Sequence, residues 1–325
     1  MKNGSFIISL DFELFWGVLD CEDYLSNLSR FKRTRRVIDN LIDVFEKNAI
    51  RATWSTVGLL MMNSSEELKS MQPAILTPTY TNQEFDNYKT FSVLRHTDEY
   101  TDDVFFARHL VRLLKVSKYQ DVGTHTFSHY YCLEDGQTIE QFNNDLMYAR
   151  DIASKNDISL TSIVFPRNQY DDRYIGNLTN HNINIFRGNP EKFIYKTRKE
   201  DNLFIRALHL IDTYLNITGN ITHLSPGPHE EIYNIKASRF LRPMNKTSRL
   251  FKNLQLKRIK NEMTYAAKNN HYYHLWWHPH NFSRFTEENF MFLQSIIEHF
   301  EYLNKTYHFS SESMESYVEK VRADG

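Results

Sequence analysis

Two histidines, His125 and His129, stand four residues apart at the end of a strand-like segment, in the run Gly-Thr-His-Thr-Phe-Ser-His. If a helical turn begins there, positions i and i+4 share one face and both imidazoles can reach one metal ion. Two of the chain's 14 histidines can also be neighbours without a shared role. The spacing makes His125 and His129 candidate metal ligands.

A second candidate group closes the first apolar run of the chain, where Asp11 and Glu13 flank Phe12. In a strand, residues i and i+2 point to the same face, so both carboxylates can enter one pocket. Two ionised carboxylates repel each other there unless a cation or an arginine lies between them. The simpler alternative is an N-cap or a salt bridge near the loop.

Two later segments also carry polar side chains at expected strand ends. Arg167 follows Phe165 and Pro166, and an arginine there can hold a carboxylate through two hydrogen bonds. In the His- and Trp-rich run after Tyr272, Trp276 and His278 share one face of a strand. His278 can therefore be a general acid beside a sugar- or acyl-binding wall, or one of several histidines in an aromatic core strand.

The apolar pattern indicates which elements position these residues. It predicts strands over 6–13, 51–58, 119–125, 160–165, 182–186 and 272–278, a last short strand near 308, and helices over 29–48, 102–117, 138–155, 247–268 and 285–303. The first strand, helix and strand form a βαβ unit, which implies a parallel sheet or barrel. We predict a single α/β barrel domain over 1–325, with an insertion or lid at 62–100 and its active site at the C-terminal ends of the strands.

The composition narrows the classes of function. The chain has 325 residues, 41% of them hydrophobic, and 39 basic against 40 acidic side chains. The near-neutral charge argues against a nucleic-acid-binding protein. Two cysteines make no disulfide framework, and neither a signal peptide nor a membrane-spanning run is evident, so we expect a cytoplasmic protein.

The order of these segments resembles the NodB-homology polysaccharide deacetylases, carbohydrate esterase family four. The shared features are the early D-x-E strand, Ala-Thr-Trp-Ser-Thr-Val-Gly, His-Thr-Phe-Ser-His, Phe-Pro-Arg and the late histidine strand. The resemblance runs from Phe6 to about Val318, apart from 62–100 and roughly 190–265. The Pro-Arg-Asn-Gln and Asp-Phe-Glu segments are most similar to a subgroup associated with bacterial surface-polysaccharide clusters.

The resemblance implies a distorted TIM-like (β/α)7 barrel that binds one divalent metal ion and hydrolyses the amide of an N-acetylated sugar. Zinc is the expected ion, with cobalt, nickel or manganese as alternatives. The ion would polarise the acetamide carbonyl and activate a water. A carboxylate would act as general base and a histidine as general acid for the leaving amine.

Carried over residue by residue, His125 and His129 match the metal ligands, and Asp11 matches the general base. The family usually has two adjacent aspartates, whereas Phe12 fills the second place here. Either Glu13 is the third metal ligand and Asp11 the base, which we favour, or the two roles are exchanged.

The remaining matches lie in the later segments. Arg167 matches the arginine that orients the base, and His278 matches the histidine acid. Trp276 stands where the family places a hydrophobic residue in the acetate-methyl pocket. Asn168 and Gln169, next along the chain, are candidate substrate-binding residues.

Two other functions stay open because of Phe12. One keeps the fold and changes the bond, giving a hydrolase of a non-sugar linear or cyclic amide. The other is a catalytically inactive barrel that binds carbohydrate. For the deacetylase, the expected substrate is a small molecule or glycan, such as a nucleotide-linked or lipid-linked intermediate or an oligosaccharide.

Residues 236–260 contain nine lysines and arginines and no acid. This segment can be a surface for an anionic substrate, or for anionic lipid headgroups in a peripheral membrane contact. It can also be a solvated helix face balanced by acids elsewhere, or Arg239 to Pro243 can line the mouth of the active site.

Overall fold

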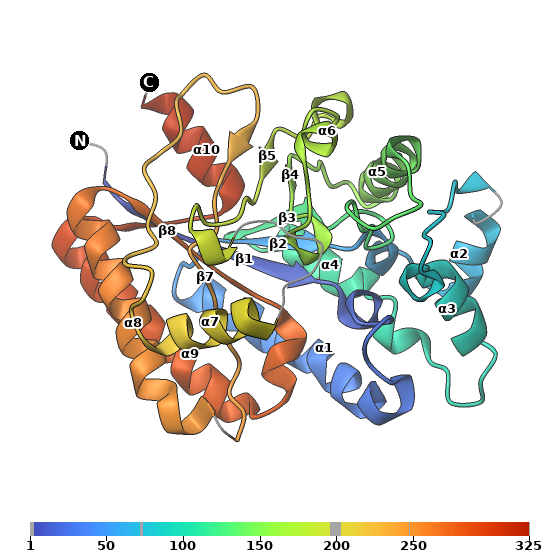
Figure 1. Ribbon diagram of the computed structural model, residues 1–325, viewed down its shortest axis with the longest axis horizontal. Helices are drawn as coiled ribbons and strands as arrows, with labels where there is room; N and C mark the ends of the chain where they lie inside the picture. The colour runs from blue at the N-terminus through green and yellow to red at the C-terminus, as the bar shows by residue number, and fades with distance from the viewer. Residues whose placement is uncertain (1–2, 72–73, 196–202, 247, 325) are drawn as a thin grey trace.

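The computed structural model describes residues 3–71, 74–195, 203–246 and 248–324, and its strands form one nine-stranded sheet surrounded by helices (Figure 1). The strands are β1 (Ser5–Phe12), β2 (Ala52–Thr56), β3 (Gln120–Thr124), β4 (Ser162–Ile163), β5 (Ile185–Phe186), β6 (Tyr233–Asn234), β7 (Arg239–Phe240), β8 (Tyr272–Trp277) and β9 (Ser310–Glu312). The helices are α1 (Tyr24–Lys47), α2 (Ser65–Met71), α3 (Asn87–Leu94), α4 (Arg108–Val116), α5 (Ile139–Ser154), α6 (Asp172–Ile175), α7 (Leu203–Tyr214), α8 (Ser248–Asn269), α9 (Thr286–Tyr307) and α10 (Met314–Ala323).

All paired strands run parallel, in the order β6-β5-β4-β3-β2-β1-β8-β7, with β9 beside β1. The path of paired strands ends at β6 and β7 in the described part of the chain, so the sheet is a curled, open barrel. Helices on its outer face supply the cover that parallel strands need. This confirms the predicted α/β class and the distorted barrel.

Strand β1 pairs with three other strands, β2, β8 and β9, and every one of its residues is buried. Its second half pairs with β2, where Asp11 lies opposite Ser55, and its other edge pairs with β8, where Ser9 lies opposite Trp276. Phe6, Ile8, Leu10 and Phe12 belong to the main hydrophobic core. The alternation of a strand leaves Ser9 and Asp11 on the interior face.

The strands and helices expected from the apolar pattern are present, with ends that shift by a few residues. Strands β6 and β7, of two residues each, were not predicted. Helix α7 was not predicted either. No helix in the described ranges combines the length and the apolar character needed to cross a bilayer.

The segment 62–100 contains α2 and α3 and packs against the loop that follows β1. Phe91 of α3 contacts Trp16 with ring centroids 4.9 Å apart. The Asn87 side-chain amide donates to the backbone carbonyls of Trp16 and Ser128. The segment thus braces two loops that carry polar side chains at the strand ends, and its role as a lid stays a prediction.

Candidate active site

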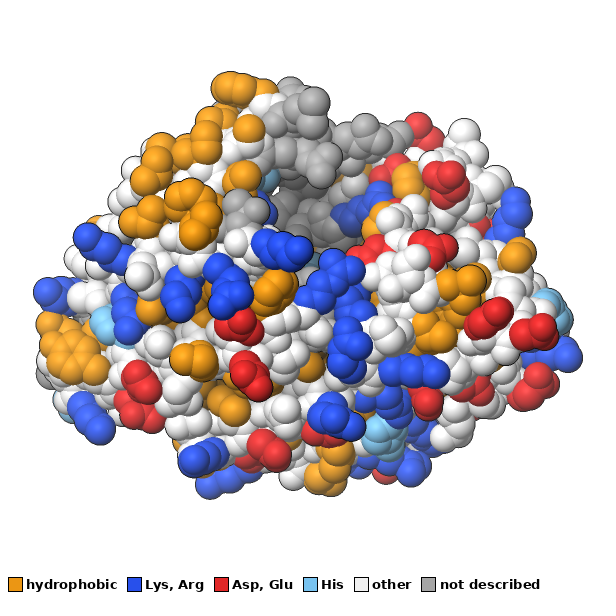
Figure 2. All heavy atoms as spheres, turned by 90° about the horizontal axis from the view of Figure 1, so that it is seen from below, with side chains coloured by type: hydrophobic (Ala, Val, Ile, Leu, Met, Phe, Trp, Pro, Cys, Tyr) orange, Lys and Arg blue, Asp and Glu red, His pale blue; other side chains and the backbone are white. Residues whose placement is uncertain are grey.

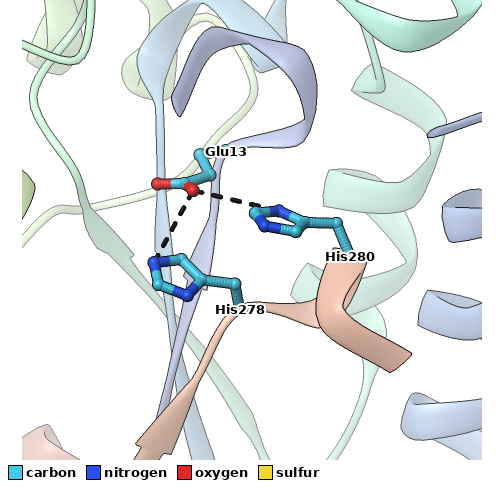
Figure 3. A group of neighbouring side chains, drawn as sticks. All are labelled: Glu13, His278 and His280. Atoms are coloured by element: carbon cyan, nitrogen blue, oxygen red, sulfur yellow. Dashed lines mark ion pairs between the residues drawn. The ribbon is translucent and has the colours of Figure 1, made fainter. Parts of the chain in front are cut away.

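Glu13, in the loop after β1, lies between two pairs of histidines. Its Oε2 is 3.4 Å from Nε2 of His125 and 3.2 Å from Nε2 of His129. Its Oε1 is 3.6 Å from Nε2 of His278 and 3.8 Å from Nδ1 of His280. Figure 3 shows the last two rings reaching the carboxylate from the segment after β8. Each oxygen of one buried carboxylate therefore faces two imidazoles.

A glycine makes room for this carboxylate. Gly17 ends the turn that follows Glu13, and a Cβ at this position would overlap the Glu13 carboxyl carbon and both of its oxygens. Any side chain at residue 17 would therefore push the carboxylate away from the histidines. The sequence shows Gly17 but not what it accommodates.

The loop that carries His125 and His129 is not helical, so the turn considered from the sequence does not form. Thr126 and His129 both have a φ of 62°, in the left-handed region. Asp145 of α5 shapes the loop instead by accepting hydrogen bonds from the backbone N–H groups of Phe127 and Ser128, at 2.6 and 3.1 Å. The imidazoles converge because a buried carboxylate holds the loop from behind.

The hydrogen bond at the far side of His125 determines which ring nitrogen faces Glu13. His125 Nδ1 lies 2.7 Å from the carbonyl oxygen of Val164, which can only accept, so Nδ1 carries the proton. The neutral ring then presents a bare lone pair on Nε2 to a carboxylate oxygen. Two electron-rich atoms at 3.4 Å are stable only with a proton or a cation between them.

Burial also favours a neutral imidazole at His129. It lowers the pKa of His129, and the hydrogen bond with Glu13 offsets this only in part. For Glu13, burial raises the pKa, but the neighbouring His278, His125 and His129 lower it well below its usual value. An ionised carboxylate beside neutral imidazoles is the state that binds metal ions.

The donor set fits a divalent metal ion. Donor atoms of Glu13, His125 and His129 all lie within 4.8 Å of one another, and so do those of Glu13, His278 and His280. Two imidazoles and one carboxylate are the ligands of many catalytic zinc sites. The first group is the tighter of the two, since its nitrogen–oxygen distances are 3.2 and 3.4 Å against 3.6 and 3.8 Å.

Asp11 is held by Arg187, a residue that the sequence did not single out. Two guanidinium nitrogens of Arg187 donate to the two oxygens of Asp11, at 2.7 and 2.8 Å, and both side chains are buried. Burial raises the pKa of Asp11, but the charge and hydrogen bonds of Arg187, together with the neighbouring His125 and His278, outweigh this and hold the pKa below its usual value. The guanidinium also stacks on Trp276, 4.1 Å from its ring centre.

The expectation that Arg167 orients Asp11 is wrong. Arg167 and Asn168 both have positive φ angles, so the chain turns aside after β4. The Arg167 guanidinium instead pairs with Asp20 and lies 3.4 Å from Glu134, and it covers the ring of Tyr131. Arg187 reaches Asp11 because it directly follows β5.

The other predicted residues lie at different distances from the site. His278 Nε2 is 3.7 Å from Asp11 Oδ2, and the His278 ring contacts Trp276 edge to face. The Asn168 side-chain oxygen accepts a hydrogen bond from Arg187. Gln169 is buried and donates a hydrogen bond to Glu134. It does not line the cavity that His278, Trp276 and Asn168 border.

A cavity of about 310 Å³ opens beside the site, with His278, Trp276 and Asn168 in its wall. Arg239, Phe240 and Arg242 also line it. This agrees with the interpretation of the basic segment 236–260 in which Arg239 to Pro243 line the mouth of the active site. Asp11 and Glu13 are buried and do not line this cavity, but His278 does, and its Nε2 lies 3.7 Å from Asp11 and 3.6 Å from Glu13.

Sequence reasoning missed Arg187 and His280. His280 is buried, and burial together with the charge of His278 lowers its pKa to about 3, so its ring is neutral. In the sequence, only its position two residues after His278 indicated that His280 belongs to the site. Arg187 had the same signal as Arg167, since both follow a predicted strand.

No protein-family model matches the sequence, and neither does any protein with a curated description. Solved structures do match. A Mycobacterium smegmatis protein assigned by name as a polysaccharide deacetylase gives a TM-score of 0.61 at 8% identity, over 100% of this chain and 92% of that one. A protein from Pseudomonas aeruginosa, also assigned by name as a polysaccharide deacetylase, gives 0.53 at 9% identity, over 97% and 89%.

A third match has another chemistry. The GH57-type branching enzyme of Pyrococcus horikoshii gives a TM-score of 0.55 at 12% identity, over 98% of this chain and 70% of that one. Such identities relate folds, and function has to be argued from the site. The chain has the curled α/β barrel fold found in NodB-type polysaccharide deacetylases.

Proposed function

We propose that the protein is a metal-dependent hydrolase that removes the acetyl group from an N-acetylated sugar in surface-polysaccharide assembly. The observation that carries this proposal is the convergence of Glu13, His125 and His129 on one point, next to an arginine-held Asp11. The deacetylase-like fold of the structural matches supports it. The order of motifs in the sequence supports it independently.

Glu13, His125 and His129 would hold the metal ion, with zinc as the first expectation and cobalt, nickel or manganese as alternatives. When bound, the ion supplies Lewis-acid polarisation of the acetamide carbonyl and a water of lowered pKa. Glu13 suits the ligand role because it faces both imidazoles, whereas the oxygens of Asp11 face Arg187.

Asp11 would be the general base. Arg187 keeps it ionised at neutral pH and fixes its rotamer, while each carboxylate oxygen retains a second lone pair for the proton of the attacking water. His278 would be the general acid, since its Nε2 lies 3.7 Å from Asp11 and its ring borders the cavity. It gives a proton to the nitrogen as the C–N bond breaks, so acetate and a free amine leave.

The cavity wall matches a substrate with an acetyl group and a phosphate. Trp276 offers an apolar surface next to His278, where the acetyl methyl would lie. Arg242 is half-buried, and its Nε donates to the Thr213 hydroxyl. Among the described residues no carboxylate pairs with Arg242, in contrast to Arg239, which pairs with Glu262. Arg242 therefore brings net positive charge to the mouth, which suits a phosphate-linked sugar.

The decisive experiment measures metal content and acetate release together. We expect wild-type protein, purified without a histidine tag, to hold about one divalent ion per chain and to release acetate from an N-acetylated nucleotide sugar or lipid-linked sugar. His125→Ala and His129→Ala should lose both. Protein that stays metal-free after reconstitution would refute the mechanism and leave a metal-free amide hydrolase or a binding protein.

A further inference from the structure

Helix α7 turns its polar side toward the protein and its apolar side outward. Asp212 is completely buried, whereas Leu210 and Ile211 are 47% and 43% exposed, and Phe204 is 68% exposed. A surface helix of a globular protein normally buries its apolar face and exposes its polar one. The orientation of α7 is the reverse.

Buried charges explain how α7 is attached to the barrel in this orientation. The Asp212 carboxylate lies 3.3 Å from Arg239 and 3.4 Å from Arg258, and it accepts a hydrogen bond from the Tyr195 hydroxyl. Glu262 completes the group by pairing with both arginines. Since buried ions must be paired, this cluster fixes the inner face of α7. On the outer side, Tyr214 contacts Phe251 of α8, with ring centroids 5.4 Å apart, while Phe204, Leu210 and Ile211 stay exposed.

The neighbouring helix α8 changes character along its length. Ile259 and Met263, in its second half, are part of the main core. In its first half Leu250 is 80% exposed, and Phe251 and Leu254 are exposed as well. The two helices border a groove of about 770 Å³. It is lined by Leu210, Ile211, Tyr214, Leu215, Asn245, Lys246, Phe251, Leu254, Arg284 and Phe285.

We refer to the exposed apolar side chains of α7 and of the first half of α8, with the groove between them, as the α7–α8 face. Cations surround it. Lys246 and Arg284 line the groove, and Lys252 and Lys257 are exposed on α8. Arg249 is also exposed and has Glu288 at 3.6 Å. Figure 2 shows hydrophobic side chains gathered beside a band of lysines and arginines.

We propose that the α7–α8 face docks on the surface of an anionic lipid bilayer. Apolar side chains ringed by lysine and arginine match the acyl boundary and the charged headgroups of such a surface at the same time. A second copy of the chain fits less well, because a two-fold contact would bring the same cations against one another. The docking goes beyond the deacetylase chemistry and does not depend on it.

The position of α7 connects this face with the catalytic cavity. His209 and Thr213 line the cavity, while Leu210 and Ile211 line the groove, so a single helix separates the two. A protein docked through the groove would hold the cavity close to the headgroups. A substrate at the membrane surface could then enter without leaving it.

The test is co-sedimentation of the full chain with vesicles of phosphatidylcholine alone or mixed with phosphatidylglycerol. The apolar variant is Leu250→Ser with Phe251→Ser, and the charge variant is Lys246→Gln with Lys252→Gln. The matched controls are Val116→Ser, exposed on α4, and Lys155→Gln, exposed after α5. All of the replaced side chains are exposed, so circular dichroism should show unchanged folding.

We expect wild type to bind the anionic vesicles and to bind neutral ones much more weakly. The charge variant should bind roughly 25-fold more weakly, at about fivefold per lysine, and the apolar variant at least about tenfold more weakly. The control variants should bind like wild type. Absence of vesicle binding, or equal binding by all variants, would overturn the proposal. So would a dimer, seen by light scattering, that the apolar variant abolishes while wild type binds no vesicles.

Discussion

Replacing Arg187 by glutamine should destabilise the protein strongly, because the buried Asp11 carboxylate would lose its cation. In the structure two nitrogens of Arg187 donate to Asp11 at 2.7 and 2.8 Å, and both side chains are buried. Removing one partner of such a pair costs about 3–5 kcal/mol. Domains are stable by about 5–15 kcal/mol in total, so we expect a folded but much weakened variant.

The loss should depend on pH in a definite direction. Arg187 helps to hold the folded-state pKa of Asp11 below its usual value. The pair therefore stabilises the wild type at pH values above the unfolded-state pKa of about 3.9, and this stabilisation is lost as the pH falls through the folded-state pKa. In Arg187→Gln, burial raises the pKa of Asp11 instead. The deficit in unfolding free energy is then full at neutral pH and shrinks as the pH falls toward the raised pKa.

Urea unfolding in the presence of a chelator, at neutral pH and about two units lower, measures this deficit. The matched control is Arg173→Gln, because Arg173 on α6 is 76% exposed and pairs with the partly exposed Asp171. It should change the unfolding free energy very little, because exposed ion pairs contribute little to stability. Equal losses in the two variants, or an Arg187→Gln deficit that grows as the pH falls, would show that Arg187 does not stabilise Asp11 as described.

Three further predictions concern the metal ligands and the cavity. Gly17→Ala should weaken zinc binding, measured by calorimetry, at least about tenfold, because the new methyl displaces the Glu13 carboxylate. Asp145→Asn should weaken zinc binding roughly 10- to 100-fold, because it removes an acceptor that shapes the histidine loop, and Asp151→Asn on the same helix should not. Arg242→Gln should raise KM for a phosphate-linked N-acetyl sugar more than for the free sugar, and equal changes for both would contradict an anion-binding role.

Most of the barrel could be predicted because each strand carries its own signal. The apolar run that becomes β1 reads directly from its residues, and its alternation places Ser9 and Asp11 on the interior face. Strands β6 and β7, of two residues each, were not predicted, whereas β4 and β5 are as short but lie within the longer strand-like runs 160–165 and 182–186. Helix α7 was not predicted, and its orientation depends on ion pairs between Asp212 and the distant residues Arg239 and Arg258.

The sequence by itself determined which residue types reach the ends of the strands: the carboxylates after β1, the paired histidines after β3 and the tryptophan and histidine after β8. Only the tertiary structure decided which of them meet. Arg167 and Arg187 are alike in sequence, yet the left-handed turn at Arg167 leads it to Asp20, while Arg187 enters the interior and meets Asp11. The physical reason is that periodicity reports neighbours along the chain, whereas contacts across a barrel depend on strand order and on which charges must be paired inside it.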